Sequence, residues 1–398
     1  MNRGMVYLFV TPFFPSPDNW RGAYCYDFVV ALKKIGQYCV EVFVPGKGED
    51  YTIGDIRVHR FAAKQLPSNV LPFLFSRRNQ KSFLHAVEMA GINTANIAVC
   101  HAHTANFAIY PIAVKARNAK CITLLHHHDL ASFGLNLGVL RHCWLYNLMQ
   151  FPILRKWHEK IDCHIFISEA SRKSFLEAPD AGWSVFDDYR KQMRWLPYRP
   201  PKIKGSVILH NGIDANIFNA GIRTKNSVFT IGCIGNFIEL KDQISLLKAV
   251  KLMNCDGVKV VFIGTGPEME RCRAFAKNYG IDAEFRSEVH HEKLPEYYRA
   301  IDLFVLPSYF EGFGCVFTES WACGTPFITC EGQGMDDLIP EGERGLWLCK
   351  PKSPTDLAVK IKYYIESRPV QHLAAEIDID KLVPDFVEKI EALRENSL

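Results

Sequence analysis

Short apolar runs alternate with amphipathic stretches along most of the chain. We predict buried β-strands for the apolar runs at residues 6–10, 40–44, 97–101, 121–125, 163–167, 207–210, 229–234, 258–263, 283–285, 303–306 and 326–329. The amphipathic stretches between them predict helices, among them 24–35, 243–253, 268–279, 294–301 and 316–323. Strands that alternate with helices in this way are typical of parallel sheets covered by crossover helices.

The two series of strands are separated by residues 214–226, which hold few apolar side chains and which we predict to be a linker. The sequence therefore predicts an α/β protein with two doubly wound parallel sheets that face each other across a cleft. We place the first domain at 1–217 and the second at 225–378, and we expect a last helix within 379–398 to pack back toward the first domain. Ligands of such sheets bind beyond the carboxyl ends of the strands.

The composition and charge of the chain exclude several classes of protein. Of the 398 residues, 48% are hydrophobic and 23% are charged, which excludes a disordered protein. The net charge of +4 is too small, over this length, to indicate nucleic-acid binding. No uncharged apolar stretch approaches the roughly 18 residues that a membrane-spanning helix needs. The first apolar run is short and is followed by Thr11-Pro12, which favours a buried strand over a signal peptide.

The 13 cysteines are an odd number, and no two of them have the spacing CxxC. Several lie within apolar runs, as Cys233 does. Buried, reduced thiols explain this pattern best. We therefore expect a cytoplasmic protein without a structural zinc site.

The most informative segment is 307–319, with the sequence PSYFEGFGCVFTE. A predicted strand ends just before it, and its glycine-bearing loop leads into a predicted helix. Loop amides at the start of a helix can bind anions and hydroxyl groups, so Glu311 in the loop and Glu319 in the helix can face one ligand at different depths. The spacing alone equally allows Glu311 to cap the helix and Glu319 to lie on its solvated face.

This segment resembles the signature of the retaining glycosyltransferases of the GT-B fold, in glycosyltransferase family four. That signature has two glutamates with seven residues between them, the first set in P-S-x-x-E-G-F-G. The resemblance continues in ACGTP at 322–326, NGID at 211–214, FIGTGP at 262–267 and ISE at 167–169. It covers nearly all of the second half of the chain and is sparser in the first half. It implies a GT-B fold of two Rossmann-like domains.

The resemblance implies a role for each matching residue. Glu319 is expected to bind the ribose hydroxyls of a nucleotide sugar, and Glu311 to meet the hydroxyls of the transferred sugar. An ionised carboxylate suits both tasks, because it accepts hydrogen bonds from a vicinal diol in two directions. The amides around Gly312, Phe313 and Gly314 are expected to line the sugar and the phosphate.

Other loops of the second half complete the expected donor site. Lys241 matches a lysine that contacts the donor diphosphate in the family, and Asn236 stands where the family usually has an arginine. Gly264 and Gly266 form a GxG turn, which we expect to pass close to the nucleotide, although a lone GxG is a weak signal. The backbone at Ser287 and Val289 is expected to meet the base.

The first half contributes two further candidate sites. Gly22 precedes a predicted helix, and a glycine there allows close approach of the backbone to a phosphate. The run His126-His127-His128 follows the predicted strand 121–125, and the resemblance implies that one histidine faces the donor sugar, without indicating which. One alternative is a metal cluster with His101 and His103, disfavoured because no acidic or cysteine ligands accompany the histidines. The other is loop histidines without a role.

The segment 139–157 is rich in leucine and aromatic residues, with Arg141, Arg155 and Lys156 interleaved. Such a helix either rests on a membrane surface or packs in the core with its cations reaching solvent. Both interpretations stay open, and with the first the protein would be peripheral at the inner face of the membrane.

As a whole, the resemblance implies a hexosyltransferase that moves a sugar from a UDP- or GDP-linked donor to a glycan or lipid-linked acceptor with retention of configuration, in polysaccharide biosynthesis. The donor is a substrate, and neither a metal ion nor another cofactor is expected. Transfer would proceed by front-face departure and attack, or with Glu311 as a covalent nucleophile. The alternatives are a phosphorylase or epimerase on the same fold, and a nucleotide-sugar-binding protein without catalysis, which Asn236 alone supports.

Overall fold

A computed structural model describes residues 4–17, 22–66, 71–128, 144–177, 200–223 and 226–395. The chain forms two compact units. Unit 1 comprises Met1–Gly212 together with Ile379–Leu398, and unit 2 comprises Ile213–Asp378. The chain therefore passes from unit 1 to unit 2 after Gly212 and returns after Asp378.

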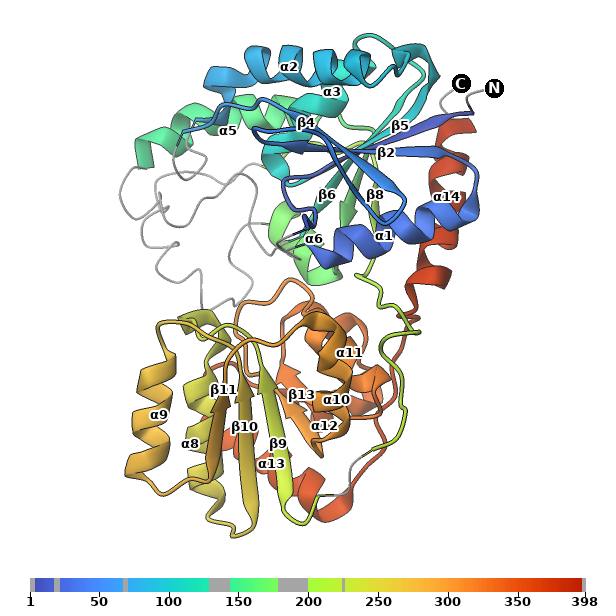
Figure 1. Cartoon of the computed structure of the whole chain (residues 1–398). Helices are drawn as coiled ribbons and strands as arrows, with labels where there is room; N and C mark the ends of the chain where they lie inside the picture. The colour runs from blue at the N-terminus through green and yellow to red at the C-terminus, as the bar shows by residue number, and fades with distance from the viewer. Residues whose placement is uncertain are drawn as a thin grey trace. The chain divides into compact units, whose positions relative to one another are not determined.

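Unit 1 is built on one sheet (Figure 1), and the strands of this sheet have the order β3-β4-β2-β1-β5-β6-β7-β8. The strands are β1 (Val6–Val10), β2 (Cys39–Pro45), β3 (Tyr51–Ile53), β4 (Ile56–Phe61), β5 (Ile97–His103), β6 (Ile122–His127), β7 (Cys163–Phe166) and β8 (Ser206–Ile208). All neighbours pair in parallel except β3 and β4, which form an antiparallel hairpin.

Helices cover both faces of this sheet. They are α1 (Ala23–Ile35), α2 (Ser76–Met89), α3 (Ile109–Lys115), α5 (Trp144–His158), α6 (Glu169–Leu176) and α14 (Ile379–Glu395). The last helix packs against the first, where the rings of Phe28 and Phe386 lie 5.8 Å apart edge to face and Lys34 Nζ donates to Asp380 at 2.7 Å. The C-terminal segment is thus part of the core of unit 1, in which Phe386 and Val383 are buried.

Unit 2 holds a second sheet, with the order β11-β10-β9-β12-β13-β14 and only parallel pairs among its described strands. Its strands are β9 (Phe229–Ile234), β10 (Val258–Ile263), β11 (Ala283–Arg286), β12 (Leu303–Val305), β13 (Phe327–Cys330) and β14 (Leu348–Cys349). Its helices are α8 (Gln243–Met253), α9 (Met269–Asn278), α10 (Leu294–Arg299), α11 (Cys315–Ala322), α12 (Arg344–Trp347) and α13 (Pro354–Ser367). Both sheets confirm the predicted α/β class.

The end predicted for strand β6 is wrong, and the difference matters for the site. We expected the strand to end at Leu125 with the three histidines in the loop after it, but it runs on to His127. Pairing sustains it, because His126 stands opposite His103 of β5 and His127 opposite Phe166 of β7. Histidine is a polar residue, so an apolar run in the sequence ends where the histidines begin. The backbone of a histidine can still hydrogen-bond to the strands on both sides, and the strand therefore continues.

The described part of the predicted linker, 214–223 and 226, also differs from the expectation. Phe218 is buried, and its ring lies 5.0 Å from that of His291. Arg223 donates to the Ile301 carbonyl at 2.8 Å. This segment is therefore docked on unit 2, because one buried aromatic side chain and a few hydrogen bonds suffice to fix a stretch that is otherwise poor in apolar residues.

The structure bears on membrane topology and on the thiols as well. None of the described helices combines the length and the apolar character that crossing a membrane requires. The cysteines of the described chain are free thiols, and most of them are buried. Burial raises the pKa of Cys163 to about 12, so this thiol stays protonated.

Candidate functional site

The candidate site of unit 2 lies at the carboxyl edge of its sheet. Strands β9, β10 and β12 are parallel neighbours, so the loops after Ile234, Ile263 and Val305 leave the sheet at the same edge. This is the edge at which open α/β sheets bind ligands. The segments that the sequence singles out in this half all start there.

Helix α11 carries Glu319 into the interior of unit 2. The helix begins after Gly314, whose φ of 84° is left-handed and suits glycine. The Glu319 carboxylate is buried, and it accepts a hydrogen bond from the Tyr298 hydroxyl at 2.8 Å. Its other oxygen lies 3.2 Å from Nε2 of His291. Burial, and then the neighbouring Glu319, raise the pKa of Tyr298 well above its usual range, so the phenol remains a donor.

Glu311 lies in the loop before α11, and its backbone is held on both sides. Its N–H donates to Gln333 Oε1 at 2.8 Å, and its carbonyl accepts from the Gly334 N–H at 3.1 Å. A Cβ at position 334 would stand 1.9 Å from the Gly312 carbonyl oxygen, so the turn at 333–334 must be this small to pack against the loop. The Glu311 side chain is free to point elsewhere, and it pairs with Lys241.

Lys241 ends the short 3₁₀ turn Glu239–Lys241 that follows strand β9. Its ammonium forms an ion pair with Glu311, and the two side chains are only 21% and 14% exposed. The sequence had assigned these residues to different parts of one ligand, and the structure brings them into direct contact. Asn236 is exposed in the same loop, and its carbonyl accepts from Gln243 Nε2 at 2.9 Å.

Gly264 and Gly266 serve the packing of two loops against each other. Their φ values of 143° and 148° are accessible essentially to glycine alone. A Cβ at Gly264 would stand 2.2 Å from the Gly235 carbonyl oxygen, and one at Gly266 2.4 Å from that of Phe237. The two glycines thus allow the loop after β10 to pack directly against the loop that leads to Lys241.

We expect Gly266→Ala to lower the free energy of unfolding by at least about 2 kcal/mol, because the new methyl group meets backbone atoms in a backbone conformation that alanine disfavours. The matched control is Gly280→Ala. Gly280 also has a positive φ, 64°, but no atom lies within 4 Å of the added Cβ, so the cost is about 1 kcal/mol. Urea unfolding of both variants tests this, and equal losses would contradict the packing role.

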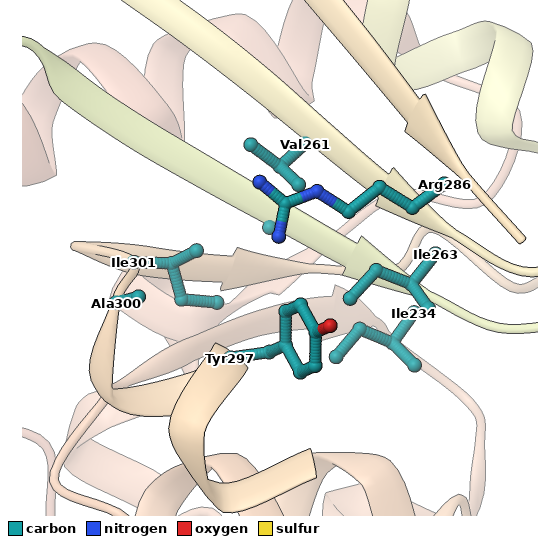
Figure 2. Close-up of a pocket in the computed structure, with 8 residues that line it drawn as sticks. Ile234, Val261, Ile263, Arg286, Tyr297, Ala300 and Ile301 are labelled. Carbon is teal, nitrogen blue, oxygen red and sulfur yellow. The ribbon is translucent and has the colours of Figure 1, made fainter. Parts of the chain in front are cut away.

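A pocket opens beside strand β11 on one face of the sheet (Figure 2). Figure 2 shows the Arg286 and Tyr297 side chains lining it, with Ile234 and Ile263 beside the Tyr297 ring. The Arg286 guanidinium lies 5.3 Å from the centre of the Tyr297 ring, and its Nε donates to Glu284 at 2.6 Å. A flat aromatic group of a ligand can stack here, because the Tyr297 ring, the Arg286 guanidinium and the aliphatic side chains all present flat or apolar surfaces.

The expected base-binding residues follow Arg286 directly. Ser287 is exposed and Val289 is half-buried. Between them, Glu288 accepts a hydrogen bond from Thr265 at 2.8 Å, which ties this segment to the glycine turn at 264–266. The pocket, the glycine turn and the Lys241 loop are thus connected through adjacent loops of unit 2.

The candidate residues of the first half lie in unit 1. Gly22 caps the start of α1 with a φ of 90°, and a Cβ there would stand 2.6 Å from the Phe13 carbonyl oxygen. Of the three histidines, His126 and His128 share one face of the sheet, with ring centres 4.1 Å apart. His127 points to the other face, where its ring stacks 4.7 Å from Phe166.

The segment 139–157 lies partly outside the described residues, which resume at Trp144. In α5, Leu154 and His158 are buried, and Leu154 packs in a small cluster with Phe166 and Phe175. This turn of the helix belongs to the core of unit 1. Arg141 lies outside the described residues, as does Asp129 after the histidine run.

Sequence reasoning missed several residues of the unit 2 site, namely Tyr298, His291, Gln333, Gly334 and Tyr297. Tyr298 and Tyr297 lie in the predicted helix 294–301, but a helical period does not say which residue meets Glu319. The run EGQG at 331–334 was a usable signal, because closely spaced glycines after a strand indicate a tight turn near a site.

Comparison with known proteins agrees with this architecture. Residues 215–377 match the family "Glycosyl transferases group 1". A D-inositol 3-phosphate glycosyltransferase of Geodermatophilus obscurus is 28% identical over 218 residues, which make up 47% of this chain but only about half, 48%, of that relative. A GDP-mannose-dependent alpha-(1-6)-phosphatidylinositol monomannoside mannosyltransferase of Mycobacterium tuberculosis is 24% identical over 85% of this chain and 84% of its own.

Among solved structures, Anabaena HepE in complex with UDP superposes with a TM-score of 0.68 at 17% identity, over 98% of this chain and 100% of that chain. HepE has also been solved with UDP-glucose. This likeness shows the fold, and the family match covers most of unit 2. Residues 215–377 therefore match the group 1 glycosyltransferases, and the chain has the GT-B fold.

Proposed function

We propose that the protein transfers a sugar from a UDP- or GDP-linked donor to a glycan or lipid-linked acceptor, with retention of the anomeric configuration. The observation that carries the proposal is the arrangement in unit 2 of two carboxylates and a lysine at one edge of the sheet. Glu319 is held by Tyr298 at 2.8 Å, and Glu311 is paired with Lys241. The names of the relatives and the UDP and UDP-glucose complexes of HepE support a nucleotide-sugar donor.

In the proposed reaction each residue has a separate task. Glu319 accepts hydrogen bonds from the ribose diol, and the pocket with Arg286 and Tyr297 takes the base. Lys241 exchanges its contact with Glu311 for the diphosphate, whose negative charge grows as the sugar departs. Glu311, released from the ion pair, then accepts from the hydroxyls of the transferred sugar. The leaving phosphate takes the acceptor proton in a front-face reaction.

A screen for nucleotide release tests the proposal. The protein is first incubated with UDP- and GDP-sugars, and a rise in Tm identifies the donor. Turnover is then followed with the donor alone, with the donor and inorganic phosphate, and with the donor and glycan or lipid-linked acceptors. Nucleotide release that depends on an acceptor, with an unchanged anomeric configuration in the product, supports the proposal. Conversion of the donor sugar without an acceptor, use of phosphate, or binding without turnover would each overturn it.

The division of labour between the two glutamates gives a binding prediction. Loss of a hydrogen bond to a charged group costs about 1.5–3 kcal/mol, so Glu319→Ala should weaken nucleoside diphosphate binding by about one to two decades. Calorimetric titration with UDP and GDP measures this. Tyr298→Phe is the matched control, because it removes the hydroxyl that holds Glu319 but keeps the carboxylate, and it should weaken binding by less. Unchanged affinity in Glu319→Ala would contradict the assignment to ribose.

A lipid-linked acceptor would bring the protein to a membrane surface, so the proposal includes a peripheral contact at the cytoplasmic face. Helix α5 is the candidate element, with Lys156 and Met149 exposed on it. Sedimentation with anionic and neutral vesicles tests this part separately from turnover.

A further inference from the structure

Seven histidines of unit 1 form two clusters on opposite faces of strand β6. The first cluster consists of His101, His103, His126 and His128, and the second of His127, His158 and His164. Strand geometry produces this division, because neighbouring side chains alternate between the faces of a sheet. In each cluster, one ring nitrogen from each of three histidines lies within 4.8 Å of the others, at His101, His103 and His126 and at His127, His158 and His164.

Hydrogen bonds tie the second cluster together. His127 Nε2 lies 3.0 Å from His164 Nδ1, and His164 Nε2 lies 3.0 Å from the carbonyl oxygen of His158. His158 Nε2 in turn lies 3.2 Å from the carbonyl oxygen of Ala105. A chain of this kind is what buried imidazoles need for their donors and acceptors, so the second cluster has a structural explanation.

The first cluster differs in its polar partners. Nε2 of His101, Nε2 of His103, both ring nitrogens of His126 and Nδ1 of His128 are buried, and none has a hydrogen-bond partner among the described residues. The first three side chains belong to residues that are 0%, 2% and 3% exposed. Buried polar atoms are almost always satisfied in folded proteins. Five orphaned nitrogens at one place therefore require an explanation that the protein atoms do not supply.

The Nδ1 atoms of His101 and His103 each have a hydrogen-bond partner. The Tyr7 hydroxyl lies 2.8 Å from Nδ1 of His101, and His128 Nε2 lies 2.6 Å from Nδ1 of His103. When both Nδ1 atoms carry the proton and donate, the Nε2 lone pairs of His101 and His103 remain open. A second hydrogen bond that fixes the tautomer and the ring in this way is typical of metal-binding histidines.

We propose that His101, His103 and His126 bind one divalent transition-metal ion, with Zn²⁺ as the favoured ion, through one ring nitrogen each. Neutral imidazoles are good ligands for Zn²⁺, and three-histidine sites with a fourth ligand are an established type. Tetrahedral Zn²⁺ with Zn–N bonds of 2.0–2.1 Å needs nitrogens about 3.3–3.4 Å apart. Since the three nitrogens already lie within 4.8 Å of one another, small ring movements close the site.

The surroundings of the first cluster suit a closed metal site. Phe9 lies 4.3 Å from the His103 ring and Phe28 lies 5.6 Å from the His101 ring, while Phe386 of α14 approaches His101 at 6.2 Å. The cluster is thus lined by apolar aromatic rings. The Nε2 lone pair of His128 accepts from His103 in this arrangement, so His128 positions His103, and a water is the candidate for the fourth ligand.

In the sequence, a metal cluster is disfavoured because no acidic or cysteine ligands accompany the histidines. The structure weakens this argument, because it brings several histidine rings together at one place. Three imidazoles are by themselves a known protein ligand set for Zn²⁺. Metal binding can be measured without a nucleotide sugar, so the test of this inference is separate from the test of the proposed transfer reaction. Transfer itself requires no step through this ion.

The test measures metal binding by the full-length, tag-free protein. After treatment with a chelator, the protein is titrated with Zn²⁺ and with Co²⁺. We expect about one equivalent of each ion, a rise in Tm of at least about 5 °C at saturation, and visible Co²⁺ absorption of tetrahedral intensity. X-ray absorption at the zinc edge should show three or four imidazole nitrogens at 2.0–2.1 Å. Failure to take up either ion, or a zinc shell of oxygens or sulfurs, overturns the proposal without any variant.

Variants then identify the cluster. His101→Gln and His103→Gln should weaken Zn²⁺ binding at least about 100-fold, and Tyr7→Phe, which removes only the orienting hydroxyl, about 10-fold. His164→Gln in the second cluster is the matched control and should retain the full equivalent. Loss of zinc in His164→Gln with retention in His101→Gln and His103→Gln would overturn the assignment. Circular dichroism of each variant verifies that the fold is intact.

Discussion

Lys241→Ala is expected to lower the rate of sugar transfer by at least two decades, about 2.7 kcal/mol or more, the scale of one lost donor to a developing anion. The reason is the scarcity of positive charge in the loop after β9. Asn236 is exposed where a second cation would stand, and it can donate a hydrogen bond but supplies no charge. In the proposed reaction Lys241 would therefore carry an unusually large share of the stabilisation of the leaving diphosphate.

The ion pair with Glu311 makes the controls for this prediction important. Lys241→Ala also leaves the Glu311 carboxylate without its partner in a largely buried position. A fall in rate from misfolding is identified by Tm, which should change little compared with Lys277→Ala, the loss of an exposed lysine at the end of α9. Lys241→Arg should restore the rate only partly, because a planar fork does not replace a point charge. Full activity in Lys241→Ala would refute the diphosphate contact.

Asn236→Arg tests the same idea in the opposite direction. If one cation is missing, the added guanidinium should tighten the binding of nucleoside diphosphate. Arg286 is poorly placed to act as this second cation. Its guanidinium donates to Glu284 at 2.6 Å and lies over the Tyr297 ring. An unchanged or weaker affinity in Asn236→Arg would mean that another group already contacts the diphosphate.

The sequence could predict those parts of the site whose conformation depends on residues close to one another along the chain. The loop and helix that carry Glu311 and Glu319 follow a strand, contain glycines and begin a helical period, and the structure has α11 at Cys315–Ala322 within one residue of the expectation. Helix α8 at Gln243–Met253 agrees residue for residue. In both cases the backbone conformation is decided within a few residues.

What the sequence could not predict depends on packing between distant segments. The bond between Tyr298 and Glu319 joins two helices, and the contact of Lys241 with Glu311 joins two loops that follow different strands. The hairpin of β3 and β4 was missed because Tyr51–Ile53 has only 3 residues, is not fully buried and pairs only with β4 at the edge of the sheet. The two faces of the histidine run likewise became visible only when β6 extended to His127.

Glu311→Gln is expected to reduce turnover by about two to three decades while leaving the affinity for nucleoside diphosphate within about threefold. Glu311 pairs with Lys241 in the structure, and in the proposed reaction it turns to the hydroxyls of the transferred sugar. Glutamine keeps the size and one acceptor oxygen but loses the charge. An interaction of this kind acts on the reacting sugar and not on the nucleotide, so kcat should fall much more than binding.

Two outcomes separate the possible tasks of Glu311. If it acts only by orienting the sugar, Glu311→Gln should retain measurable transfer, and Glu311→Asp should retain some of it as well. If the carboxylate forms a covalent glycosyl intermediate, Glu311→Gln should abolish transfer, and the wild type should show a burst of nucleotide release before steady state. Normal turnover in Glu311→Gln would remove Glu311 from the reaction altogether.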